Sequence, residues 1–233
     1  MRFGYPRSAM PPPTAIDLYG PEMFHRVRLF RPDADLGGAL ARCIAAQRES
    51  LGPARATFAP VGDAEERVSV DALAAARAGG GRSDLRTDPE LSNCLVFHTS
   101  GLPGSVDDPG VVELREVADA LIRDRLRELV GVARLELRAS GHFWYPPGSY
   151  MGWHTNARVP GWRAYVTYAE EPARSFFRFV DPQSGAVHTS WDDGWDLRIF
   201  RVEPDRPFWH SVYSGTDRFS FGYHVVVPAA PGA

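Results

Sequence analysis

Hydrophobic residues recur at helical spacing in two segments of the first half of the chain. Residues 33–50 place four hydrophobic residues and Gln47 on one helical face, and Asp33 or Asp35 can cap the start of the helix. Residues 108–131 carry the strongest amphipathic pattern, and Gly131 can end it. The two stripes comprise Leu36, Leu40, Cys43, Ile44 and Gln47, and then Val112, Val117, Leu121, Ile122, Leu126, Leu129 and Val130. Both segments predict amphipathic helices that cover a core.

Weaker patterns occupy the rest of the first 131 residues. Residues 25–30 alternate polar and apolar side chains, which predicts a strand. Residues 68–84 predict a short helix that ends in a glycine-rich loop. Residues 1–15 are rich in proline and small residues, so we expect a flexible N-terminus. We expect residues 16–131 to form a mixed, mainly helical region that supports the remainder of the same domain.

The hydrophobic period changes to two at residue 132, where short segments rich in aromatic and β-branched residues begin. They read ARLELRASGHFWYPPG, RAYVTYAEE, SFFRFVDPQSG, AVHTSWDDG, WDLRIFRVEPD, PFWHSVYSG and RFSFGYHVVV. The DPQSG and DDG sequences are typical of hairpin turns. Many short strands in one stretch predict a sandwich or barrel. The prediction is an α+β fold whose all-β core spans residues 132–228.

Composition narrows the classes of protein that fit. The 233 residues are 44% hydrophobic and 24% charged, which suits one globular domain. The net charge of −3 gives no positive field to attract nucleic acid. All 26 residues of the Lys+Arg count are arginines, which removes lysine chemistry. Cys43 and Cys94 form no CxxC pair, and no signal core or long apolar run occurs, so we expect a reduced, cytoplasmic protein without a membrane partner.

Two of the seven histidines have neighbours that suggest a metal site. A non-haem Fe(II) site uses two histidines and one carboxylate and leaves positions open for other ligands. Residues i and i+2 of a strand point to the same side, so His154 and residue 156 could reach one ion, and His210 could join them from a distant strand. Residue 156 is an asparagine, so the expected carboxylate is absent there.

A candidate anion site follows the second histidine. Arg218 and Ser220 lie eight and ten residues after His210 and share one side of a predicted strand. A planar guanidinium with a nearby hydroxyl suits a buried carboxylate, and each such charge-assisted hydrogen bond contributes about 1.5–3 kcal/mol.

Over roughly residues 132–227, these motifs resemble those of the 2-oxoglutarate-dependent Fe(II) oxygenases. The family pattern is His-x-Asp/Glu, a distal His and a downstream Arg-x-Ser, which here reads His154-Thr155-Asn156, His210 and Arg218-Phe219-Ser220. The segment Tyr145-Pro146-Pro147-Gly148 is similar to one that precedes the first histidine in the prolyl-hydroxylase-like branch. The resemblance implies a double-stranded β-helix (a cupin-like jelly roll) that uses Fe(II), 2-oxoglutarate and O₂. It implies His154, His210 and Asn156 as catalytic metal ligands, and Arg218, Ser220 and Tyr145 as co-substrate-binding residues.

Asn156 departs from the family pattern, and four interpretations stay open. An amide oxygen can bind a metal but carries no charge, and one charge pair at ~4 Å is worth about 4 kcal/mol at an effective dielectric of ~20. We favour an oxygenase in which Asn156 binds the metal directly or through water. Alternatively, chloride fills the position and the enzyme halogenates, or a carboxylate such as Glu170, Asp181 or Asp192 completes the site. In the fourth interpretation the jelly roll is a catalytically silent binding domain.

Other residues near the motifs are weaker candidates. Trp153 precedes the first histidine and is expected to pack in the core, although it could wall a substrate pocket. Arg158 and Arg163 could bind an anionic group of the substrate, and Tyr165 could face the barrel interior and contact the co-substrate. Neither a GxSxG nor an HExxH motif occurs, which argues against serine or zinc hydrolysis. The predicted function is oxidation, by default hydroxylation, of a small metabolite or natural-product intermediate.

Overall fold

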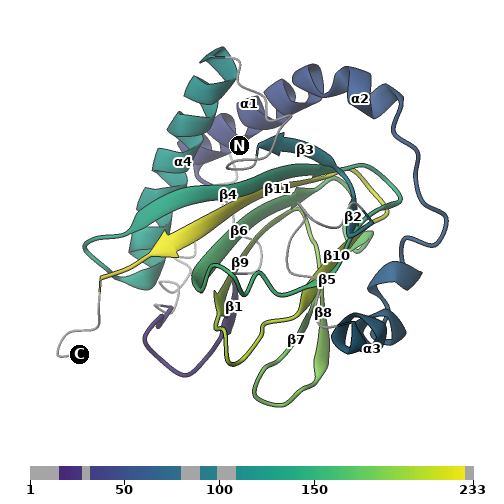
Figure 1. Ribbon diagram of the computed structural model, residues 1–233. Helices are drawn as coiled ribbons and strands as arrows, with labels where there is room; N and C mark the ends of the chain where they lie inside the picture. The colour runs from purple at the N-terminus through teal and green to yellow at the C-terminus, as the bar shows by residue number, and fades with distance from the viewer. Residues whose placement is uncertain (1–15, 28–31, 80–89, 99–108, 229–233) are drawn as a thin grey trace, which may run out of the picture.

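The computed structural model describes residues 16–27, 32–79, 90–98 and 109–228 (Figure 1). The expected flexible segment 1–15 lies outside these residues. The helices are α1 (Ala34–Ser50), α2 (Gly52–Ala56), the 3₁₀ helix η1 (Glu66–Val68), α3 (Val70–Ala78) and α4 (Pro109–Val130). The strands are β1 (Phe24–Val27), β2 (Ser92–Asn93), β3 (Leu95–His98), β4 (Glu136–Tyr145), β5 (Ser149–His154), β6 (Gly161–Ala169), β7 (Ser175–Val180), β8 (Val187–Trp191), β9 (Trp195–Val202), β10 (His210–Ser214) and β11 (Arg218–Val226).

The strands form two antiparallel sheets that face each other. The larger sheet has the order β1-β9-β6-β11-β4-β3 and the smaller has the order β2-β5-β10-β7-β8. Along the chain from β4 to β11, the strands are distributed as four in each sheet, with β4, β6, β9 and β11 in one and β5, β7, β8 and β10 in the other. This interleaving of two four-stranded sheets is the double-stranded β-helix, or jelly roll, that the sequence predicts.

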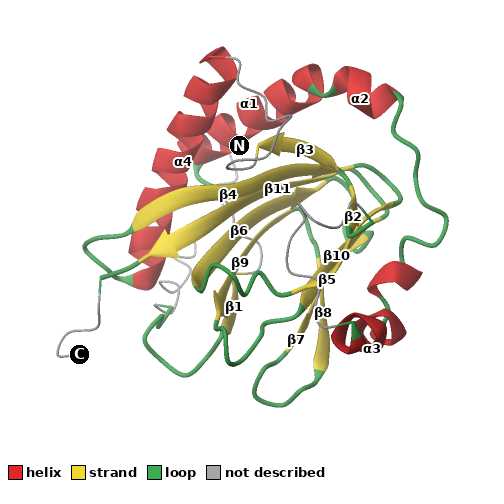
Figure 2. Cartoon of the chain, viewed as in Figure 1, coloured by secondary structure: helices red, strands yellow, loops and turns green. Residues whose placement is uncertain are grey.

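Helices α1 and α4 cover the outer face of the larger sheet (Figures 1 and 2). Asp33 caps α1 by accepting a 2.9 Å hydrogen bond from the amide of Leu36. The predicted α1 stripe is buried throughout. The predicted α4 stripe is partly wrong, because Val117 is 44% exposed and Ala118 is buried in its place. Residues 118, 122, 126 and 129 are three or four apart and make a narrower stripe, which places position 117 about 100° away from it.

The predicted period-two segments leave out residues 149–153, although the proposed metal motif places His154 on a strand and all six residues of β5 are buried. The strand ends at His154, so the prediction that residue 156 lies two positions further along the same strand is wrong. The sequence Ser149–His154 contains Gly152 and Ser149, which do not favour strands locally. Its stability comes from partners distant in the sequence. Gly152 donates a 2.7 Å hydrogen bond to the carbonyl of Leu91, and a Cβ at this glycine would lie 3.2 Å from the same oxygen. The close approach of the two backbones therefore requires a small residue at position 152.

The space between the two sheets is filled mainly by aromatic side chains. The buried members of this inner cluster are Tyr145, Met151, Phe177, Phe179, Phe200, Val202, Phe208 and Val212. The outer face of the larger sheet contributes instead to the core under α1 and α4, through residues such as Phe219 and Phe221. Polar residues on the inner faces are therefore exceptions in an apolar interior, and they define the candidate site.

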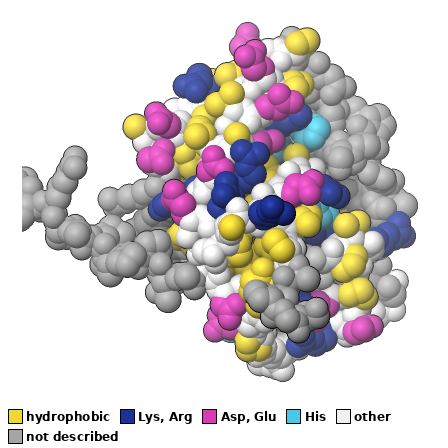
Figure 3. All heavy atoms as spheres, turned by 90° about the vertical axis from the view of Figure 1, so that its left-hand side faces the viewer, with side chains coloured by type: hydrophobic (Ala, Val, Ile, Leu, Met, Phe, Trp, Pro, Cys, Tyr) yellow, Lys and Arg dark blue, Asp and Glu magenta, His cyan; other side chains and the backbone are white. Residues whose placement is uncertain are grey.

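The surface carries both signs of charge. On the side shown in Figure 3, acidic and basic side chains are interspersed among apolar ones, and no large area of one sign is visible among the described residues. Among the described residues, no helix is both long enough and apolar enough to cross a bilayer.

Candidate active site

A β-bulge at the end of β5 directs His154 into the interior. His154 is opposite His210 in β10, whereas Met151 is opposite Val212, so three steps along β5 match two steps along β10. Met151 packs in the inner cluster, and Trp153 packs on the outer face with Leu73 of α3. Without the extra residue, strict alternation would place His154 on the outer face instead. The bulge thus brings the two histidines together.

His154 and His210 form a buried pair with ring centroids 4.1 Å apart. Their exposed fractions are 3% and 0%. The Nδ1 atom of His154 lies 2.8 Å from the carbonyl of Gly152, and the Nδ1 atom of His210 lies 3.0 Å from that of Phe208. A carbonyl oxygen can only accept, so each Nδ1 carries the proton and each Nε2 presents a lone pair.

Both imidazoles are neutral at physiological pH. Burial lowers the pKa of His154 to about 4, although its hydrogen bond to Gly152 acts in the opposite direction. Burial also lowers the pKa of His210 well below its usual value, with smaller contributions from His154 and Arg163. Neutral imidazole is the form that binds metals.

Asn156 is the third polar residue of this group. Its Nδ2 lies 3.2 Å from Nε2 of His210, and its side chain is hydrogen-bonded to Tyr165. Asn156 has a φ of 54°, a left-handed conformation that asparagine tolerates better than most residues. The following turn is held by a 3.1 Å hydrogen bond from the amide of Val159 to the carbonyl of Asn156. In this arrangement the amide nitrogen faces the histidine, and rotation of the side-chain amide would present its oxygen instead.

These three residues can act as ligands of a divalent metal, although none of them carries a negative charge. A metal-bound histidine usually donates its other ring N–H to a carbonyl or carboxylate, as both histidines do here. No group of three or more His, Cys, Asp or Glu residues that could hold a metal occurs among the described residues. The donor set is therefore two imidazoles and one amide, and the part of the chain that the structure describes adds no anionic ligand to it.

The three carboxylates considered as substitutes for residue 156 are engaged elsewhere. Glu170 forms an ion pair with Arg48, and both side chains are exposed. Asp181 accepts hydrogen bonds from Gln183 and Ser184 in the turn between β7 and β8. Asp192 is bound by arginines on the inner faces of the sheets. The prediction that one of them completes the metal site is wrong, because none of these three described carboxylates forms a group with the two histidines that could hold a metal.

Arg218 lies at the start of β11 and is 1% exposed. Its Nε donates a 2.9 Å hydrogen bond to Oδ2 of Asp192. Its two terminal nitrogens, Nη1 and Nη2, are buried and have no hydrogen-bond partner among the described residues. Ser220 follows on the same face of β11 and is 5% exposed. A buried guanidinium with two free N–H₂ groups is a ready site for a carboxylate.

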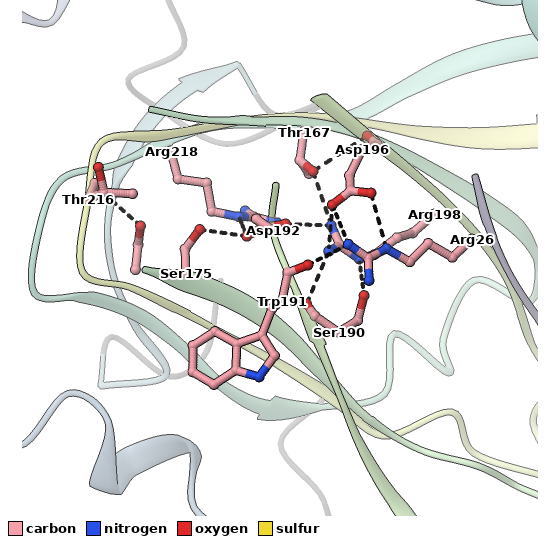
Figure 4. Close-up of polar contacts among 11 residues, drawn as sticks. Arg26, Thr167, Ser175, Ser190, Trp191, Asp192, Asp196, Arg198, Thr216 and Arg218 are labelled. Atoms are coloured by element: carbon pink, nitrogen blue, oxygen red, sulfur yellow. Dashed lines mark hydrogen bonds and ion pairs between the residues drawn. The ribbon is translucent and has the colours of Figure 1, made fainter. Parts of the chain in front are cut away.

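Arg218 is one end of a buried chain of alternating charges (Figure 4). Asp192 lies between Arg218 and Arg198, with 2.7 Å between Arg198 Nη1 and Asp192 Oδ1. Asp196 lies between Arg198 and Arg26, at 3.4 and 2.6 Å. Three guanidinium groups and two carboxylates leave one net positive charge. One anionic group at the free end of Arg218 would neutralise the chain.

Asp192 remains ionised in this chain. Burial alone would raise the pKa of its carboxyl, but Arg198 and Arg218 together hold that pKa well below its usual range. Ser175 adds a 2.6 Å hydrogen bond to Oδ2 of Asp192. Asp192 therefore fixes the orientation of Arg218 through its Nε and leaves the terminal nitrogens available.

Two buried tyrosines lie near these groups, Tyr145 against Arg218 and Tyr165 against His210. The Tyr145 ring lies 5.1 Å below the guanidinium carbon of Arg218, and its hydroxyl lies 3.8 Å from the sulfur of Met151. The Tyr165 ring packs edge-on against His210, with centroids 6.4 Å apart. Burial raises the pKa of both tyrosines, so both keep their protons and can donate hydrogen bonds.

The three residues that were predicted to contact the substrate lie in different environments. Arg163 is 2% exposed and shares the inner face of β6 with Tyr165, and its guanidinium donates to the carbonyls of Val159 and Trp162. Arg158 is exposed in the turn after β5. Trp153 is placed away from the histidines, on the outer face of the smaller sheet, where its Nε1 donates to the carbonyl of Ser69. Only Arg163 is buried close enough to His210 to affect its pKa.

The sequence reasoning missed the roles of Asp192, Asp196 and Arg198. Asp192 was interpreted as part of a turn or as a metal ligand. A signal was present in β9, where Asp196 and Arg198 alternate with Leu197 and Ile199. Alternating charged residues of opposite sign in an otherwise apolar strand indicate that the second face is a buried polar one.

Comparison with known proteins gave matches among solved structures only. The sequence matches no protein-family model, and a search of curated proteins gave no match. Among solved structures, the chain is similar to a prolyl-4-hydroxylase from Pseudomonas putida, with 14% identity, a TM-score of 0.49 and coverage of 88% of this chain and 93% of that one. It is also similar to a collagen prolyl hydroxylase of Paramecium bursaria Chlorella virus-1 in complex with 2-oxoglutarate, with 10% identity, a TM-score of 0.43 and coverage of 89% and 98%. The rice dioxygenase for auxin oxidation matches with 15% identity, a TM-score of 0.41 and coverage of 90% and 76%.

Proposed function

We propose that this protein is an Fe(II)- and 2-oxoglutarate-dependent oxygenase. One observation carries the proposal: a histidine pair and the free end of a buried arginine occupy the interior of one jelly roll, with Tyr145 packed against the arginine and Tyr165 against His210. A metal and a small dicarboxylate could bind there together. The resemblance of the His154, His210 and Arg218 motifs to those of the oxygenase family supports the same assignment.

Each polar residue of the interior has a part in this proposal. His154 and His210 bind the metal through Nε2, and Asn156 contributes its amide oxygen or a bound water. Arg218 and Ser220 hold the far carboxylate of 2-oxoglutarate, and Tyr145 and Tyr165 donate hydrogen bonds to it. When bound, the metal and O₂ supply the oxidising chemistry, in which 2-oxoglutarate is consumed to succinate and CO₂. The surrounding phenylalanines exclude water from the reacting groups.

The proposed substrate is a small metabolite or natural-product intermediate, and hydroxylation is its proposed reaction. Arg163 supports an anionic group on the substrate, because it is buried and has no ion-pair partner among the described residues, in contrast to Arg198 and Arg218. Arg158 is the weaker candidate, since it is exposed.

Anaerobic absorption spectroscopy tests the proposal. Addition of Fe(II) and 2-oxoglutarate to the metal-free protein should give a weak visible charge-transfer band, because the keto acid and the histidines would bind one ion. Arg218→Ala should raise the 2-oxoglutarate concentration needed for half of this band by about ten-fold or more, which corresponds to the loss of one charge-assisted contact. A native protein that gives no band at saturating Fe(II) would contradict the proposal.

A catalytically silent jelly roll that binds a carboxylate is the second candidate. The contact between the Asn156 amide nitrogen and Nε2 of His210 favours it, because that contact occupies the lone pair that a metal needs. This candidate requires that the protein bind 2-oxoglutarate equally well with and without metal and that it form no succinate.

A further inference from the structure

The interior of the jelly roll carries an excess of positive charge. Among the described residues, the cationic side chains that line it or join its charge chain are Arg26, Arg163, Arg198 and Arg218, and the anionic ones are Asp192 and Asp196. Four guanidinium groups against two carboxylates leave two positive charges. The side chains of His154, His210 and Asn156 add no negative charge to offset this excess.

A divalent cation on its own is therefore poorly accommodated. It would enter a space that is already positive, and its three protein donors would bring no compensating charge. At an effective dielectric of ~20, each pair of unit charges ~4 Å apart contributes about 4 kcal/mol, so the missing carboxylate is a large loss. A dianionic ligand would supply two negative charges, one at the metal and one at the free end of Arg218.

We infer that Asn156 makes metal binding depend on the dicarboxylate: the protein binds the divalent metal tightly only when the dianionic keto acid is present, and binds the dianion before the metal or with it. The inference rests on the proposed function, because it takes the same two sites. It adds that the two ligands are strongly coupled and that residue 156 sets the coupling. Linkage requires this coupling to be reciprocal, so the metal also tightens binding of the dicarboxylate.

The reason for the coupling lies in residue 156. With Asn156, no anionic oxygen of the described residues accompanies the histidines, so the ligand supplies the first one that can neutralise the metal. With an aspartate at this position, the protein supplies one negative charge, so the metal can bind alone. The same carboxylate would then repel the keto-acid end of the ligand and reduce the coupling between the two.

Manganese titrations with Asn156→Asp as the matched variant test the inference. Free Mn²⁺ would be measured by electron paramagnetic resonance, with metal-free protein in halide-free buffer, with and without saturating 2-oxoglutarate. In the native protein, 2-oxoglutarate should tighten Mn²⁺ binding by at least about 100-fold. In Asn156→Asp the tightening factor should be smaller by about ten-fold or more, because one charge pair contributes at least that factor even after screening. A titration without protein measures chelation of Mn²⁺ by 2-oxoglutarate in solution, and Arg218→Ala measures how much of the tightening depends on the site for the far carboxylate.

The possible outcomes separate this inference from the proposed function. Equal tightening in the native protein and in Asn156→Asp would overturn the inference and leave the oxygenase proposal standing. Absence of 2-oxoglutarate binding to either protein by calorimetry, with or without Mn²⁺, would overturn the oxygenase proposal itself. Chloride that tightens Mn²⁺ binding as much as 2-oxoglutarate does would also overturn the inference, because a small anion and not the dicarboxylate would then supply the missing charge. Circular dichroism and thermal unfolding of Asn156→Asp check that the variant is folded, and position 156 accepts aspartate at its φ of 54°.

Discussion

Asp192 joins two buried arginines, so its removal should have a large effect on stability. In Asp192→Asn, the carboxylate that lies 2.7 Å from Arg198 and 2.9 Å from Arg218 becomes a neutral amide of similar size. The variant leaves two fully buried guanidinium groups without the charge that separates them. Removal of one partner of a buried ion pair costs about 3–5 kcal/mol. We expect the lower end of this range, because an amide can still accept a hydrogen bond.

Thermal and urea unfolding would measure this loss. A decrease of about 3 kcal/mol corresponds to a fall in Tm of roughly 6–12 °C for a chain of this length. Asp63→Asn is the matched control, because Asp63 forms an exposed ion pair with Arg67 at 3.0 Å and should cost about 1 kcal/mol or less. The pKa of Asp192 lies below its unfolded value, so its contribution is present at neutral pH and is lost as the pH falls below about 4. A cost for Asp192→Asn no larger than that for Asp63→Asn would refute the reasoning.

Two further predictions concern the histidine pair and the loop before β5. The pKa of His154 is about 4 in the folded protein against an ordinary value of 6.5, so the unfolded chain takes up this proton at a higher pH than the folded one does. The free energy of unfolding of the metal-free protein should therefore fall by on the order of 3 kcal/mol between pH 6.5 and pH 4. Urea unfolding across this range measures the fall, and a flat profile would contradict a neutral, buried pair. Gly148→Ala should lower the free energy of unfolding by about 1–3 kcal/mol, because Gly148 has a φ of 79° and a Cβ there would lie 2.6 Å from Cβ of Pro60. Gly62→Ala, where a Cβ meets nothing within 4 Å, serves as its control in the same thermal unfolding assay, and equal costs would argue against the close contact.

The fold was predictable from the sequence where local patterns determine it. Period-two alternation after residue 132 predicted the β core, and the helical stripe at 33–50 matches the buried face of α1. Residues 149–153 of β5 were missed because the pairing of this strand depends on Leu91 and on β10, which are distant in the sequence. Its bulge has no local signature, yet it decides that His154 faces inward and Trp153 outward.

The candidate site was predictable in part. The spacing of His154, His210 and Arg218 identified residues that the structure places on the inner faces, and the two histidines are in contact. The contact of Arg218 with Asp192 was not predicted, because Asp192 lies in the turn between β8 and β9, and no motif joins it to Arg218 or to its other partner, Arg198. The excess of buried positive charge emerges only when all these side chains are placed together.

A crystal structure of the protein grown anaerobically with Mn²⁺ and 2-oxoglutarate tests the central claim most directly. The account predicts one metal ion bound by Nε2 of His154 and Nε2 of His210, with the far carboxylate of 2-oxoglutarate on Nη1 and Nη2 of Arg218. A structure in which the two rings bind no common ion, or in which the dicarboxylate lies away from Arg218, would contradict it.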